Sequence, residues 1–245
     1  MKALLFLPLG AIALAGYVYA GHHISLSSGG NQITGNGILK TQNRQVAPYS
    51  KIVIGSAFEG QFFETTPGPL TLSAESNVLP LIETKVENDT LYVNLKGSMS
   101  LKRGLRITGR TAKISSVDAS GASQIELKNI GRHALTVKGS GASKVSVFGA
   151  PNSLKLDASG ASQMKFGNLT LETLVADLSG ASNLTLAGTV QNATVSASGA
   201  STFAGNISGG KFKGTASGAS NLNISGHFTT CVTSASGASQ ISRPY

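Results

Sequence analysis

The chain has 245 residues, of which 40% are hydrophobic and only 13% are charged, which is long enough for a substantial buried core. Its formal net charge of +9 favours anionic partners such as polysaccharides or lipid headgroups. The single cysteine, Cys231, excludes a disulfide framework and is expected to be a small buried hydrophobe. There is no Trp, and few aromatic residues accompany the basic segment, which argues against a nucleic-acid-binding module.

The N-terminus has the pattern of a secretory signal peptide. Lys2 is followed by an apolar run from Ala3 to Gly16, and Val18 and Ala20 supply small residues at the expected cleavage site. We therefore predict a signal peptide at residues 1–20 and a flexible lead at 21–33. An exported protein follows from this, in the periplasm, on the outer cell surface or secreted. The alternative is an uncleaved anchor, since the apolar run is of borderline length for spanning a membrane.

Residues 34–117 show strand signals without a regular repeat. Short apolar or alternating runs are separated by Gly, Pro and Asn or Asp residues, as is typical of strands joined by turns. The runs lie at 52–54, 61–63, 70–72, 81–86 and 91–95. This segment is predicted to form irregular β coils that are continuous with the following segment and cover its N-terminal end.

Residues 118–245 are organised by seven copies of the tetrapeptide Ser-Gly-Ala-Ser. Successive copies are 19 or 20 residues apart, and they begin at Ser120, Ser140, Ser159, Ser179, Ser198, Ser217 and Ser236. So constant a period is the sequence signature of a solenoid, in which each repeat is one coil that buries its apolar side by stacking on its neighbours.

Aligning the copies shows apolar ladders separated by polar positions, the period-two pattern of half-buried strands. One ladder follows the motif, at Ile125, Val145, Met164, Leu184, Phe203, Leu222 and Ile241, and another precedes it, at Leu135, Leu154, Leu174, Ala193, Phe212 and Cys231. A coil of this length is too short for a strand–helix–strand unit, which needs about 30 residues. The predicted fold is all-β, a right-handed parallel β-helix.

The motif itself is predicted to turn a corner. Its Gly supplies a positive φ or room for close packing. The following Ala, Ala122 through Ala238, is expected to point inward, and the serines are expected to form hydroxyl ladders on the outside.

Several segments together resemble the head GIN domain family of auto-transporter adhesins. The matching residues are Gly35–Gly37, Arg44–Ile54, Leu72–Ile82, Leu91–Val93 and the Asp-Ala-Ser-Gly-Ala-Ser repeats at 118–123 and 157–162. The resemblance implies an exported bacterial protein with a β-helix-like fold and a role in adhesion, without an established biochemical activity. No C-terminal segment has the alternating pattern of an auto-transporter barrel.

Two groups of residues are candidate sites. A run of cations without an intervening acidic residue could meet an anionic polymer, unless it is only a solvated edge: Lys96, Lys102, Arg103, Arg106, Arg110 and Lys113. The second group lies two residues before each motif, where Asp157 and Asp177 fall on neighbouring coils. Such a pair could bind Ca²⁺ or act as acid and base on a glycan, or be a solvated edge relieved by nearby lysines.

The sequence favours a non-enzymatic, exported β-helix that binds glycans or an anionic envelope polymer, with no cofactor unless Ca²⁺ binds at Asp157 and Asp177. The alternative is a carbohydrate-active enzyme, a polysaccharide lyase or glycosidase, acting on anionic polysaccharide. Ice binding by stacked hydroxyls is a third hypothesis. No HExxH, paired-Cys or Gly-x-Ser-x-Gly pattern points to another chemistry.

Overall fold

The computed structural model describes residues 32–242. The predicted signal peptide at 1–20 and most of the predicted lead at 21–33 lie outside the described residues. Among the residues described, the only helix is one 3₁₀ turn, η1 (Leu79–Leu81), and none is long and apolar enough to cross a membrane. The structure confirms an all-β fold.

The irregular segment holds ten strands and the repeat segment holds the others. The first group is β1 (Ile33–Thr34), β2 (Leu39–Arg44), β3 (Lys51–Ile54), β4 (Phe58–Glu64), β5 (Gly68–Glu75), β6 (Ile82–Glu87), β7 (Thr90–Leu95), β8 (Met99–Ser100), β9 (Leu105–Thr111) and β10 (Ser116–Ala119). The second is β11 (Gln124–Ile130), β12 (Ala134–Gly139), β13 (Lys144–Gly149), β14 (Ser153–Ala158), β15 (Gln163–Leu178), β16 (Asn183–Ala197), β17 (Thr202–Ala216), β18 (Asn221–Ser225), β19 (Phe228–Ala235) and β20 (Gln240–Ser242).

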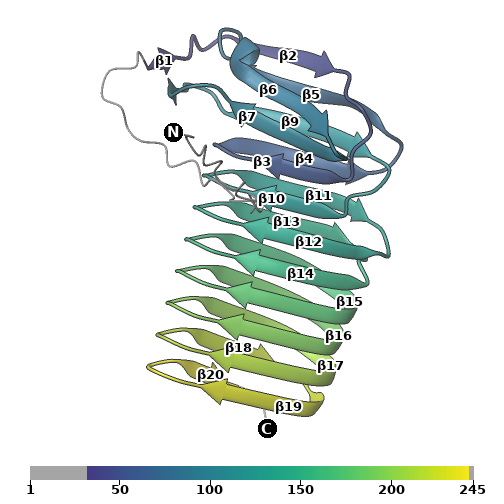
Figure 1. Ribbon diagram of the computed structural model, residues 1–245, viewed down its shortest axis with the longest axis vertical. Helices are drawn as coiled ribbons and strands as arrows, with labels where there is room; N and C mark the ends of the chain where they lie inside the picture. Colours follow the sequence, from purple (N-terminus) through teal and green to yellow (C-terminus); the bar gives the residue numbers. More distant parts are fainter. Residues whose placement is uncertain (1–31, 243–245) are drawn as a thin grey trace, which may run out of the picture. The chain divides into compact units, whose positions relative to one another are not determined.

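Parallel pairing stacks the coils of the repeat segment directly upon one another (Figure 1). We call the strands that lead into each motif the leading wall: β7, β3, β10, β12, β14, the second halves of β15–β17, and β19. Those that follow it form the following wall: β9, β4, β11, β13, the first halves of β15–β17, β18 and β20. Both predicted ladders are confirmed in register; Ile125 pairs with Val145, and Leu135 with Leu154. Their side chains fill the core between the walls.

The corner at the motif differs from the prediction, because its Ala faces outward and its last Ser faces inward. Ala161 is exposed, whereas Ser162 is fully buried, as are the equivalent serines of the five other coils from Ser123 to Ser220. The alternation explains this: Met164 points into the core, so Ser162, two residues earlier, does so too. Gly and Ala occupy the two central turn positions, away from the core. The predicted outer hydroxyl ladder at this serine was therefore wrong.

The glycine of the motif was correctly predicted to have positive φ, for example +68° at Gly160. The Ala161 N–H, next along the chain, donates to the Gly141 carbonyl of the preceding coil at 2.7 Å. The same bond recurs down the stack, so the turns join neighbouring coils as the strands do.

The N-terminal coils pair with the coils of the repeat segment, but their stacking order is not their chain order. The coil of β3 and β4 lies between the coil of β7 and β9 on one side and that of β10 and β11 on the other. Strands β2, β5 and β6 then run antiparallel to their partners and close this end of the stack (Figure 1). A two-residue turn, Asn88–Asp89, joins β6 to β7, and both residues have positive φ, as a tight hairpin requires.

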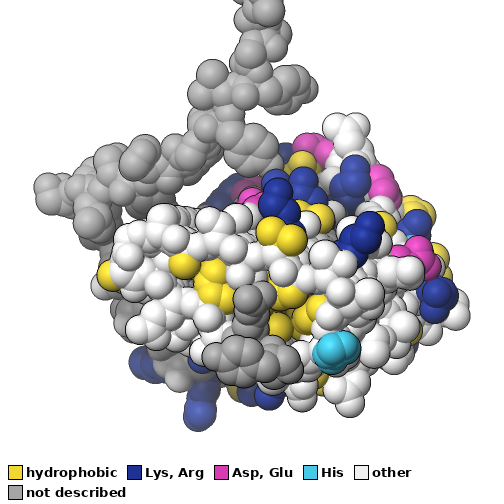
Figure 2. All heavy atoms as spheres, turned by 90° about the horizontal axis from the view of Figure 1, so that it is seen from below, with side chains coloured by type: hydrophobic (Ala, Val, Ile, Leu, Met, Phe, Trp, Pro, Cys, Tyr) yellow, Lys and Arg dark blue, Asp and Glu magenta, His cyan; other side chains and the backbone are white. Residues whose placement is uncertain are grey.

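The opposite end of the stack has no such covering strands among the described residues. Seen from that end, hydrophobic side chains lie in the middle of the last coil with polar side chains around them (Figure 2). Cys231 is on the predicted inward ladder but is only half-buried, because it belongs to this last coil.

Candidate functional site

Two carboxylates of the leading wall lie on neighbouring strands. Asp157 and Asp177 are direct partners in the strand ladder, and Ser196 and Thr215 continue the same row. These four residues line a shallow groove of about 210 Å³ beside the motif turns. The pair therefore offers two carboxylates and several hydroxyls along one line.

The same row begins at Asp118, which is separated from Asp157 by Lys138. Burial raises the pKa of Asp118 above its ordinary value; the Lys138 charge opposes this shift and the Asp157 charge adds to it. No three His, Cys, Asp or Glu side chains within residues 32–242 are grouped so that they could hold a metal ion. A Ca²⁺ ion at Asp157 and Asp177 would therefore take its other ligands from hydroxyls, backbone oxygens and water.

The predicted basic cluster is spread along and beyond β9 rather than gathered at one point. The strand turns Arg106 and Arg110 outward on the following wall, while Lys102 and Arg103 precede the strand and Lys113 follows it. Two of the six cations are already paired: Arg106 Nε lies 2.9 Å from Glu59 Oε2, and Lys96 Nζ lies 2.6 Å from Glu83 Oε1. All six are exposed, so they give a diffuse positive field with Arg106 and Arg110 at its centre.

A groove of about 330 Å³ lies on the following wall, where β9, β4 and β11 run side by side. Its polar lining residues are Glu59, Gln61, Arg106, Thr108, Gln124 and Glu126. The groups are held in fixed positions, because Gln61 Nε2 donates to Glu126 Oε2 at 3.0 Å and Arg106 pairs with Glu59. Sequence reasoning missed this groove, because the pairing of β4 with both β9 and β11 depends on the exchanged stacking order.

Further down the same wall, two polar rows continue from this groove. They carry mainly amides, hydroxyls and lysines, one row at Lys144, Gln163, Asn183, Thr202, Asn221 and Gln240 and the other at Ser146, Lys165, Thr185, Ala204, Asn223 and Ser242. Neighbouring members are about 4.8 Å apart, the spacing of paired strands. The wall is therefore an extended polar surface that is hollowed at its N-terminal end.

A second groove of about 420 Å³ adjoins the first coils at the β4–β5 turn, lined by Phe63, Thr65, Thr66 and Arg110. On its other side, Phe63 meets Lys128, whose Nζ lies 5.6 Å from the ring centroid. This contact places a cation over an aromatic face.

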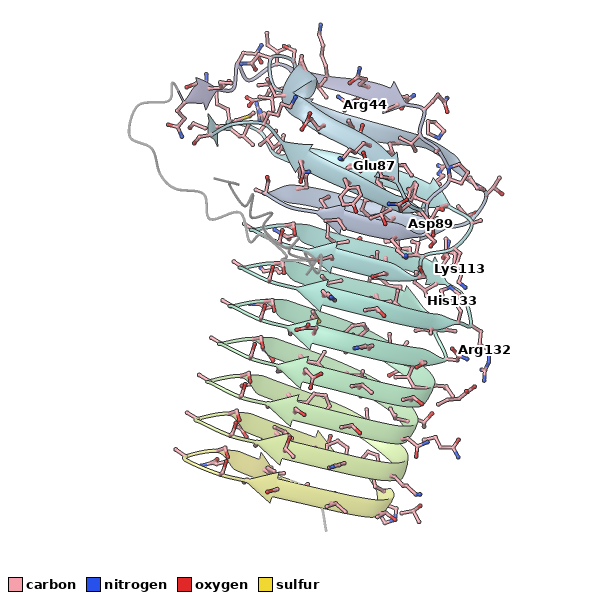
Figure 3. The ribbon with its side chains drawn as sticks, in the orientation of Figure 1. Arg44, Glu87, Asp89, Lys113, Arg132 and His133 are labelled. Carbon is pink, nitrogen blue, oxygen red and sulfur yellow. The ribbon has the colours of Figure 1, made fainter. Side chains whose placement is uncertain are left out.

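At the edge of the coils opposite the motif turns, Glu64 joins three segments. It accepts hydrogen bonds from the backbone N–H groups of Ile114 and Gly131, and lies 2.8 Å from His133 Nε2. The other ring nitrogen of His133 faces the Ala134 carbonyl at 3.0 Å. Figure 3 shows His133 at this edge near Arg132 and Lys113. None of Glu64, Ile114, Gly131 and His133 lines the three grooves described above, so the cluster fastens the coil edge.

The fold and the grooved polar wall define a class: a parallel β-helix with an extended, chemically mixed outer surface. The chain belongs to the family described as "Putative auto-transporter adhesin, head GIN domain", which matches residues 48–227. This confirms the resemblance found in the sequence.

Solved structures of similar fold come from the genera Parabacteroides and Bacteroides. A "putative adhesin" from Parabacteroides merdae superposes with a TM-score of 0.74 at 16% identity, covering 87% of this chain and 99% of its own. A "putative lipid binding protein" from Parabacteroides distasonis gives 0.72 at 16% identity, covering 87% and 100%. A "putative adhesin" from Bacteroides fragilis gives 0.63 at 18%, covering 86% and 100%. No curated protein matches the chain. At these identities the likeness concerns the fold alone.

Proposed function

We propose that this chain is an exported, non-enzymatic binding module whose following wall contacts glycans or another anionic polymer of a cell envelope. The observation that carries the proposal is the 330 Å³ groove, lined by carboxylate, amide, hydroxyl and guanidinium groups, and its continuation into two polar rows. Groups of these kinds recognise the hydroxyls and charges of sugars through hydrogen bonds.

The charge of the wall supports an anionic partner. Its outward positions carry five cations and only two carboxylates: Arg106, Arg110, Lys128, Lys144 and Lys165 against Glu59 and Glu126. A surface with this excess attracts polyanions and speeds their encounter. Repetition at strand spacing suits a long polymer, because many weak contacts can form at once.

The predicted signal peptide supports export, and a family named for adhesins supports a role outside the cytoplasm. An adhesin needs a surface that binds rather than a site that reacts. The adhesin-like role is therefore consistent with a broad polar wall.

Binding to isolated envelope fractions and to a glycan array tests the proposal. A double variant of the following wall, Lys144→Gln with Lys165→Gln, should weaken binding and reduce its salt dependence. The matched control removes two exposed lysines of the leading wall, Lys211→Gln with Lys213→Gln, and should leave binding unchanged. Background binding of the native chain, or equal losses in both double variants, would contradict the proposal.

The second candidate function is cleavage of an anionic polysaccharide. Asp157 and Asp177 favour it, because they are strand partners that line one groove. Release of reducing or unsaturated sugars from a polyuronate, abolished by Asp157→Asn, would favour the enzyme over the binding module. A melting temperature that rises with CaCl₂ in the native chain but not in Asp177→Asn would establish a Ca²⁺ site.

A further inference from the structure

A strip of alternating cations and aromatic rings crosses four neighbouring strands at the edge of the following wall. In order of the stack it consists of Arg110 on β9, Phe63 on β4, Lys128 on β11 and Phe148 on β13, and we call it the cation–aromatic strip. Phe63 is the strand partner of both Arg110 and Lys128. Phe148 follows Val147, the partner of Leu127, and lies opposite Lys128 and Asn129, where the register of β11 and β13 shifts by one residue.

The strip departs from the polar pattern of the wall. Phe148 is 53% exposed, one of four large hydrophobic residues that are exposed in the described part of the chain. Its exposed ring leaves an apolar face open to a ligand beside the cations of the strip. Phe63, on the other side of Lys128, is half-buried and has the Lys128 ammonium over its ring. The strip therefore offers one open apolar ring, Phe148, and one partly covered ring about 10 Å away.

The cations of the strip differ in how they are paired. Lys128 Nζ lies 3.1 Å from Glu126 Oε2, so part of its charge is neutralised. Arg110, in contrast, forms no ion pair with any carboxylate of residues 32–242. Its side chain lines the 420 Å³ groove at the β4–β5 turn together with Phe63 and two threonines. This volume falls in the range of pockets that hold small ligands.

We infer that the cation–aromatic strip and its groove bind a short stretch of an acidic polysaccharide through its carboxylated sugars. A sugar ring has an apolar C–H face, which packs on the exposed ring of Phe148. Its carboxylate meets the guanidinium of Arg110, which can bind it in a bidentate manner. The two threonine hydroxyls of the groove supply hydrogen bonds to the ring hydroxyls. From Arg110 to Phe148 the strip extends about 14 Å, enough for several linked sugars.

This inference rests on the proposed function and names its ligand class. The probe is a polygalacturonate oligosaccharide, and its fully methyl-esterified form is the uncharged control. Arg110→Gln should weaken binding of the acidic form roughly tenfold, the effect of losing one charge-assisted contact, and should barely affect the ester. Phe148→Ser should weaken binding of both forms, because both keep the apolar sugar face.

Lys213→Gln on the leading wall is the matched loss of charge and should change neither affinity; equal melting temperatures show that the variants are folded. Equal losses in Arg110→Gln and Lys213→Gln would mean diffuse attraction and would overturn the inference. So would binding to anionic lipid vesicles in place of the oligosaccharide. If the native chain binds envelope fractions and both strip variants bind them equally well, the inference fails while the proposed function stands. If the native chain binds neither the oligosaccharide nor the envelope fractions above background, both the inference and the proposed function fail.

Discussion

Replacing Gly160 by Ala tests how the motif holds the coils together. Gly160 has φ +68°, and a Cβ added there would lie 2.7 Å from the Gly141 carbonyl oxygen and 3.0 Å from the Gly141 nitrogen. That carbonyl also accepts the Ala161 N–H at 2.7 Å. The substitution therefore imposes a left-handed backbone on a residue with a side chain and crowds a bond between two coils.

The left-handed conformation costs about 1–2 kcal/mol outside glycine. Weakening the hydrogen bond adds about 1 kcal/mol. A total of roughly 2–3 kcal/mol corresponds to a fall of about 4–12 °C in melting temperature for a chain of this size. Circular dichroism melts of the two proteins measure this difference.

Gly167→Ala is the matched control, because Gly167 has no heavy atom within 4 Å of its added Cβ and lacks a positive φ. It should melt at or slightly above the native temperature, since Ala reduces the freedom of the unfolded chain. A Gly160→Ala protein as stable as the native one, or a larger loss in Gly167→Ala, would refute the assignment of the motif glycine as the close-contact point between coils.

Four further substitutions probe buried and half-buried polar groups, and the melting temperature is measured for each. Ser220→Ala should cost about 1 kcal/mol of stability, since the Ser220 hydroxyl donates to the Ser217 carbonyl at 2.8 Å. Ser162→Ala should cost nothing, since the Ser162 hydroxyl has no hydrogen-bond partner among residues 32–242. Glu64→Ala should cost about 2–3 kcal/mol, because two backbone N–H groups and His133 lose their acceptor. An unchanged melting temperature would show that Glu64 does not hold the coil edge together. Asp118 has a raised pKa, so the folded state holds its proton more tightly and loses stability as the pH rises through that pKa. Asp118→Asn should therefore be more stable than the native protein at pH 7, with the advantage vanishing below the ordinary value of 3.8; a constant difference across this range would disprove it.

The regular coils were predictable because stacking forces equivalent residues of each repeat to meet. Once Ile125 and Val145 are aligned on the motif, parallel pairing and the inward face follow from period and alternation alone. The same alternation, continued backward from Met164, would have placed Ser162 inside. The error came from treating all four motif residues as one corner, although only Gly160 and Ala161 leave the strand pattern.

The stacking order of the N-terminal coils was not predictable in this way. Asn88–Asp89 marks a tight hairpin in the sequence, but no repeat indicates that β7 will pair with β3 rather than follow β4. The site depends on that order, since Arg106 and Glu126 line one groove only because β4 lies between β9 and β11. Residues far apart in sequence are thus brought together by long-range strand pairing, which local sequence patterns do not encode.

The division between regular and irregular coils also suggests which part of the proposed binding surface would discriminate between polymers. In the regular coils, outward rows present similar amides and hydroxyls at each step. On the proposed function, such rows would hold a polymer without favouring one position along it. The exchanged first coils break this repetition, since they bring Glu59, Arg106 and Arg110 to the following wall beside Phe63. Both large grooves of that wall lie there. A polymer would therefore be recognised at the irregular end and held along the regular rows. Variants of the first coils should then change which polymer binds. Variants of the later rows should change only how tightly it binds.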